Sequence, residues 1–125
     1  MELLNLLNFI ETQRQERYRA FIIWGEAMSG KTNFARQFAQ AVGADYLDLL
    51  AHVAASPELK ASIDLLDPMR LRDLLLHLPT QSQYVIIDNP DFLLNTWSDA
   101  QRREFFHIVE KLDNVQTDQV FCFVL

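Results

Sequence analysis

The chain has 125 residues, half of them hydrophobic, and a formal net charge of −6 at pH 7. This length suits one domain with a buried core, and the composition excludes an intrinsically disordered chain. The acidic balance argues against a broadly basic nucleic-acid surface, although a local basic patch or contacts made through a partner remain open. The single cysteine can form no intramolecular disulfide, and no apolar run reaches the ~18 residues of a membrane span. We therefore expect a cytoplasmic protein.

The first third of the chain predicts a helix, a strand and a second helix. Residues 2–18 carry apolar side chains at helical spacing, which predicts an amphipathic N-terminal helix within a unit of residues 1–18. A short apolar run at 20–24 is cut off by glycine, as a buried strand is before a turn. The periodicity then becomes helical over 30–42, and Gly43 stands where a left-handed helix C-cap belongs.

The remainder continues the alternation of strands and helices. Strands are predicted at 45–50, 84–88 and 120–125, and the last two are continuously apolar. Two short helices or one broken helix fill 57–78, because Ser56-Pro57 and Asp67-Pro68 each resemble a cap followed by a first-turn proline. Ser98 and Gln101 form a capping-box pattern that opens a helix ending near Leu112. This alternation predicts an α/β fold with a mostly parallel sheet covered by helices on both faces.

The segment "GEAMSGKT" at 25–32 satisfies the pattern G-x-x-x-x-G-K-[ST] between a buried strand and a helix. Glycines let the backbone turn tightly, and successive N–H groups together with the helix N-terminus form an anion site. The lysine would reach the β- and γ-phosphates of a nucleotide, and the threonine hydroxyl would ligate Mg²⁺. The residues expected to bind the cofactor are Gly25, Glu26, Ala27, Met28, Ser29, Gly30, Lys31, Thr32 and Asn33. The alternative is a strand–turn–helix junction that only resembles this motif.

An acidic residue at the end of another apolar strand should complete such a site. Asp88 follows "YVII" and is expected to hold Mg²⁺ through water, opposite Thr32. Lys31, Asp88 and Asn89 are the predicted catalytic residues. Asn89 can orient water but is a poor base, so slow or partner-dependent hydrolysis is expected. Asp91 is an alternative base.

Two segments give the chain a family resemblance. "FIIWGEAMSGKTNFARQFA" resembles the Walker A segment of AAA+ class P-loop ATPases. "YVIIDNPDFLLNTWSDAQRREFFHIVEKL" is similar to the Walker B strand and following helix of bacterial replication initiators and helicase loaders. By size and pattern the chain also resembles the small P-loop protein of bacterial phage-exclusion (BREX) systems. The resemblance covers residues 18–125 and implies ATP and Mg²⁺ as cofactors within a P-loop domain of residues 19–125.

The resemblance also implies a strand order, and the chain departs from it. The family order 5-1-4-3-2 becomes 1-4-3-2 here, without the fifth strand and without a lid. Asn89 stands where many members carry a second acid. We expect either a fragment of a longer polypeptide or a partner that covers the exposed sheet edge.

Several assignments remain open at the level of sequence. The nucleotide state is expected to control either the binding of a protein partner or self-assembly into a homo-oligomer. Direct nucleic-acid binding is undecided. A regulatory or adaptor protein that binds nucleotide without hydrolysis is the main alternative, and a small-molecule kinase is disfavoured because no arginine-rich lid follows. Tyr18 and Arg19 are better placed than Trp24 to contact the base. Arg102 and Arg103 are expected to lie on a solvated helix face. The alternative is that one of them acts as an arginine finger on a neighbouring subunit.

Overall fold

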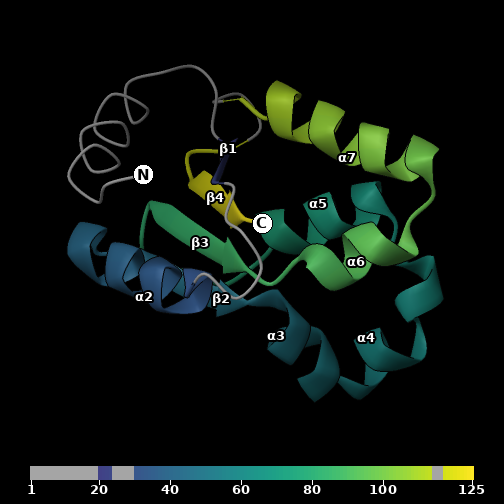
Figure 1. Ribbon diagram of the computed structural model, residues 1–125, viewed down its shortest axis with the longest axis horizontal. Coiled ribbons are helices and arrows are strands. Elements are labelled where there is room, and N and C mark those ends of the chain that lie inside the picture. Colours follow the sequence, from purple (N-terminus) through teal and green to yellow (C-terminus); the bar gives the residue numbers. More distant parts are fainter. Residues whose placement is uncertain (1–19, 24–29, 114–116) are drawn as a thin grey trace.

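The computed structural model describes residues 20–23, 30–113 and 117–125, and every structural statement below concerns these residues (Figure 1). The predicted N-terminal helix at 2–18 and the motif residues Gly25–Ser29 lie outside them. So do Tyr18, Arg19 and Trp24, whose predicted roles stay predictions.

Four parallel strands form a single sheet in the order β1-β4-β3-β2. This arrangement confirms both the predicted α/β class and the predicted strand order. The strands are β1 (Ala20–Ile23), β2 (Asp45–Asp48), β3 (Tyr84–Asp88) and β4 (Val120–Val124). The interior strand β4 is buried at every position, as a strand covered on both faces should be.

Helices alternate with these strands along the described chain. They are α2 (Lys31–Val42), α3 (Leu49–Ala55), α4 (Pro57–Ala61), a 3₁₀ turn η1 (Ile63–Leu65), α5 (Pro68–Leu76), α6 (Asp91–Thr96) and α7 (Asp99–Lys111). In the ranges that the structure describes, no helix is both long and apolar enough to cross a membrane.

Helices cover both faces of the sheet, so the fold has three layers (Figure 1). One core cluster joins α2 to alternate strand residues, with Phe38, Ile86 and Cys122 at its centre. The other cluster joins α3, α5, α6 and α7 to the opposite face, around Leu71, Phe105 and Phe121. Every strand residue can therefore be assigned to a face by the two-residue alternation of a strand.

The predicted helix ends agree with the structure. Gly43 adopts the left-handed conformation with φ 68° and ends α2, because glycine meets no Cβ penalty there. The side chains of Ser56 and Asp67 cap α4 and α5 ahead of their first-turn prolines. Ser98 and Gln101 make both hydrogen bonds of a capping box at the start of α7.

Two local predictions were wrong or incomplete. The strand predicted at 45–50 ends at Asp48, because this side chain accepts a hydrogen bond from the Ala51 N–H at 3.1 Å and starts α3 at Leu49. The segment 57–78 does contain two short helices, as predicted, with η1 between them. The short helix α6 was not predicted, since Pro90 rather than a hydrogen-bonding side chain stands at its N-cap.

Candidate functional site

All four strands end at one edge of the sheet. Ile23 pairs with Val124, Val124 pairs with Asp88, and Asp88 pairs with Asp48. The Leu125 N–H donates to the Ile23 carbonyl at 2.9 Å and extends the pairing of β1 with β4. In open parallel sheets, ligands bind outside this carboxyl edge.

The first turn of α2 lies at the same edge. The helix ends at Gly43, two residues before β2 begins at the opposite edge, and it packs on β2 and β3. Its 12 residues span about 18 Å, which is close to the length of the strands beside it. Its N-terminus therefore returns to the carboxyl edge, where β1 ends.

Gly30 is the N-cap of this helix and has the left-handed conformation with φ 78°, and its carbonyl accepts the first helical bond from the Phe34 N–H at 3.0 Å. None of the described side chains caps this end, and its first turn contains no acidic residue. The N–H groups of the first turn have no partner within the helix. Together with the positive end of the helix dipole they favour an anion.

Three predicted binding residues follow Gly30 on this turn. Lys31 and Thr32 are the first two residues of α2, and the Thr32 side chain is half-buried. Asn33 is exposed. The structure thus places the described end of the predicted motif at the carboxyl edge of the sheet.

Asp88 is the one charged residue that is fully buried in the described chain, with 0% exposure. It shares a face with Tyr84 and Ile86, because Val85 and Ile87 belong to the opposite cluster. That shared face is the one that α2 covers. Asp88 therefore lies at the carboxyl edge, on the α2 side of the sheet.

Among the described residues, two neutral donors contact the Asp88 carboxylate. The Tyr46 hydroxyl donates to Oδ2 at 2.6 Å, and the backbone N–H of Asn89 donates to Oδ1 at 3.0 Å. Buried carboxylates are rarely left without a cationic partner, because desolvation of the charge is costly. A cation bound at this edge would offset that cost.

Tyr46 was not predicted as a site residue. Burial, followed by the hydrogen bond to Asp88, raises the pKa of its phenol to about 12, so it remains a donor at neutral pH. The Arg36 guanidinium lies over its ring, 5.4 Å from the centroid. One feature of the sequence could have pointed to it: Tyr46 precedes the strand end by two residues, so it faces the same side as Asp48. The pairing of Asp48 with Asp88 is needed to place it beside the carboxylate.

The structure brings Asn89 next to Asp88 in an uncommon backbone conformation. Its φ is 57°, and it is the one non-glycine residue of the described chain with a positive φ. Asparagine tolerates this region better than most residues. The turn directs the Asn89 N–H back to the carboxylate, while Asp91 begins α6 and lies in its first turn.

The available metal ligands are few. In the described ranges, no group of three or more His, Cys, Asp or Glu side chains could hold a metal ion. Thr32 and Asp88 fit Mg²⁺ by chemistry, since both offer oxygen atoms. Phosphate and water would have to complete the octahedron, as Mg²⁺ commonly allows.

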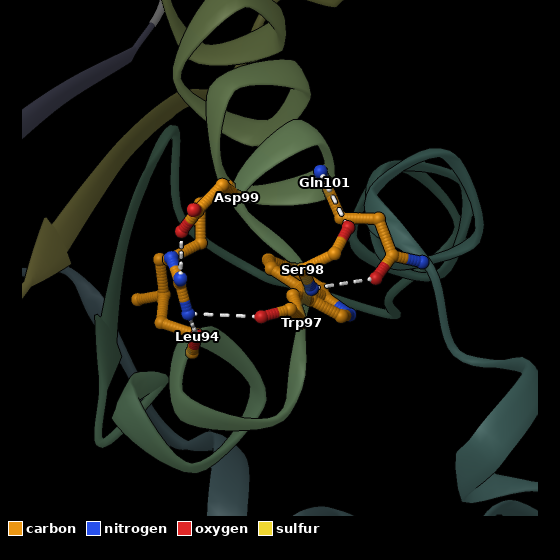
Figure 2. A network of polar contacts seen from close by, with 6 residues as sticks. Leu94, Trp97, Ser98, Asp99 and Gln101 are labelled. Atoms are coloured by element: carbon orange, nitrogen blue, oxygen red, sulfur yellow. Dashed lines mark hydrogen bonds and ion pairs between the residues drawn. The ribbon is translucent and has the colours of Figure 1, made fainter.

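Arg102 has a structural role at the junction of α6 and α7. Its Nη1 donates to the carbonyls of Leu94 at 2.9 Å and Trp97 at 2.8 Å, and its Nη2 pairs with Asp99 (Figure 2). These bonds hold the ends of two helices together and engage the guanidinium within the domain. Arg103 is exposed, so of the two arginines it is the better candidate for a contact in trans.

A scan against models of protein families, a search of curated proteins and a search of solved structures each find no match. The fold class and strand order are therefore established by the sheet itself.

Proposed function

We propose that the chain binds ATP with Mg²⁺ at the junction of β1 and α2. Residues 25–33 would enclose the phosphates, and Lys31 would neutralise the β- and γ-phosphates. Thr32 would ligate the metal directly, while Asp88 would hold it through water. The proposal includes membership of the AAA+ class, which the two sequence segments resemble.

The observation that carries the proposal is the position of Asp88. A fully buried carboxylate, which accepts only neutral donors among the described residues, faces the side of the sheet that α2 covers. The N-terminal turn of α2 carries the glycine–lysine–threonine at the same edge. A divalent cation at this edge would contact both the phosphate held at the anion site and the carboxylate, and would so bridge phosphate and protein.

Hydrolysis is proposed to be slow or to depend on a partner. The residue after Asp88 is an amide, and an amide cannot accept the proton of an attacking water at neutral pH. Its left-handed turn commits the backbone N–H to Asp88. The nucleotide state would then be transmitted to a protein partner or to a second copy of the chain, in a DNA-related or phage-defence process.

Asn89 also favours a second candidate function. A regulatory or adaptor protein would bind nucleotide as a stable ligand and never hydrolyse it. Phosphate release separates the two candidates. Release by wild type, alone or with a partner, that falls in Asn89→Gly supports the ATPase, because glycine keeps the turn and removes the amide. No release under any condition supports the adaptor.

Binding itself is tested by titrating a fluorescent ATP analogue into wild type and Lys31→Ala, with Mg²⁺ and with EDTA. Lys60→Ala is the matched control, since Lys60 is an exposed lysine on α4. We expect Lys31→Ala to weaken Mg²⁺·ATP binding by about tenfold or more, because a charge-assisted phosphate contact is lost. Lys60→Ala should bind as wild type does.

Equal affinity of wild type and Lys31→Ala would overturn the proposal. The same titration, followed by analytical ultracentrifugation, tests the assembly. A change in size that nucleotide produces in wild type but not in Lys31→Ala supports a homo-oligomeric output, and an unchanged size points to a separate protein partner.

A further inference from the structure

We propose that Tyr46 is a positioning residue that orients the Asp88 carboxylate toward a hydrated Mg²⁺ ion. This inference rests on the proposed function and names a residue outside the motif. It assigns to β2 a part in metal binding, in addition to the ends of β1 and β3.

The carboxylate is held at both oxygens. Oδ2 accepts the Tyr46 hydroxyl at 2.6 Å, and Oδ1 accepts the Asn89 N–H at 3.0 Å. An ionised carboxylate has about four acceptor positions, so with the donors of the described residues alone each oxygen keeps one position free. With one donor on each oxygen, bidentate binding of the metal is disfavoured. The free positions suit water molecules that Mg²⁺ retains.

Tyr46 is itself fixed from the other side. It is half-buried on β2, packs against the cluster around Phe38 and Ile86, and carries the Arg36 guanidinium over its ring. Arg36 is exposed on α2, two turns at most from Thr32. The ring is thus held between the metal-binding carboxylate and the helix that begins with the phosphate-binding turn.

The chain supplies a matched tyrosine. Tyr84 belongs to the same cluster and lies on β3, the strand of Asp88, but four residues before it. Its hydroxyl is buried and has no hydrogen-bond partner in the described part of the chain. Removal of this hydroxyl changes the same face of the sheet without touching the carboxylate.

The test compares wild type, Tyr46→Phe and Tyr84→Phe. ATP affinity is measured with Mg²⁺ and with EDTA, and the ratio of the two affinities gives the Mg²⁺ enhancement for each protein. We expect Tyr46→Phe to lower the enhancement by about tenfold, since a hydrogen bond to a charged group is lost. Its affinity for ATP in EDTA should match that of wild type. Tyr84→Phe should retain both values.

A purely structural role of Tyr46 predicts another pattern. If Tyr46→Phe leaves the enhancement unchanged, or weakens binding equally with Mg²⁺ and with EDTA, the inference is wrong while the proposed function stands. If wild type binds no ATP, or binds it without Mg²⁺ enhancement, the proposed function fails and the role of Tyr46 fails with it.

A measurement on the wild-type protein gives a second test, in which the Tyr46→Phe variant serves only to assign the resonance. In protein labelled with ¹³C at the tyrosine ζ carbon, Mg²⁺ added to the ATP-bound protein should shift the resonance that Tyr46→Phe identifies. The Tyr84 resonance should stay in place. A Tyr46 resonance that does not respond to Mg²⁺ would contradict the inference.

Discussion

Replacement of Asp88 by asparagine tests whether the carboxylate is kept for function or for stability. The side chain is completely buried, and its two described donors are the Tyr46 hydroxyl and the Asn89 N–H. Asparagine has nearly the same shape. Its Oδ1 can accept from the Asn89 N–H, and its Nδ2 can donate to the Tyr46 oxygen once the phenol proton turns away. Both contacts survive in neutral form.

The expected magnitude follows from two opposing terms. Hydrogen bonds to a charged group contribute about 1.5–3 kcal/mol and neutral ones about 0.5–1.5 kcal/mol, so two weakened bonds lose about 2 kcal/mol. The variant no longer buries an ion, and that penalty is several kcal/mol in proteins. In the absence of metal, we therefore expect Asp88→Asn to be as stable as wild type or up to about 2 kcal/mol more stable.

Asp88→Ala serves as the contrasting variant. It leaves the Tyr46 hydroxyl and the Asn89 N–H without their acceptor. A fully buried donor left unsatisfied costs about 1–3 kcal/mol, and these two partly buried donors should fall in the lower part of that range. We expect Asp88→Ala to be less stable than Asp88→Asn by about 2–4 kcal/mol. Both variants should lose the Mg²⁺ enhancement of ATP binding.

The assay is urea unfolding in EDTA, followed by far-UV circular dichroism, with ATP titrations on the same preparations. A loss of more than about 2 kcal/mol of unfolding free energy in Asp88→Asn would contradict this expectation, because the charge would then stabilise the sheet edge. Full Mg²⁺ enhancement of ATP binding in Asp88→Asn would contradict it as well.

Three further predictions concern other residues. Asn89→Ala should be less stable than Asn89→Gly by about 1 kcal/mol in urea unfolding, since alanine resists the left-handed φ of 57°; equal stability would show that the turn relaxes. Arg102→Ala should lose about 1–3 kcal/mol of unfolding free energy in the same assay without a change in ATP affinity, because it loses its hydrogen bonds to α6. Arg103 is exposed, so Arg103→Ala should lose almost none. A larger loss of stability in Arg103→Ala than in Arg102→Ala would contradict the structural role of Arg102. Burial raises the pKa of the Cys122 thiol well above its usual range, so a thiol reagent at pH 8 should modify the native protein far more slowly than the urea-unfolded protein, and equal rates would contradict its burial.

The sheet was largely predictable from the sequence because local patterns carry it. The apolar run at 84–88 predicts a strand and the glycine at 43 predicts a helix end, and both predictions need only neighbouring residues. Strands that alternate with helices are compatible with few parallel topologies. The strand order itself came from the resemblance to AAA+ ATPases. The structure agrees with it even though the comparisons find no match.

Only those residues of the candidate site that belong to a contiguous sequence pattern could be predicted. The motif at 25–32 and Asp88 are readable because each stands at the end of an apolar run. Tyr46 was missed because its contact with Asp88 joins residues 42 positions apart and depends on the pairing of β2 with β3. The turn at Asn89 was missed because a positive φ in a non-glycine residue has no reliable sequence pattern.

The central claim is that Thr32 and Asp88 hold the same metal ion, and a double-mutant cycle on Mg²⁺·ATP affinity tests it most directly. Thr32→Val, Asp88→Asn and the double variant are compared with wild type, with affinities in EDTA as the reference. If one ion joins the two side chains, the double variant loses little more than the weaker-binding single variant, with a coupling of at least about 1 kcal/mol. If the two losses add within about 0.5 kcal/mol, the residues act independently and the proposed metal site is wrong.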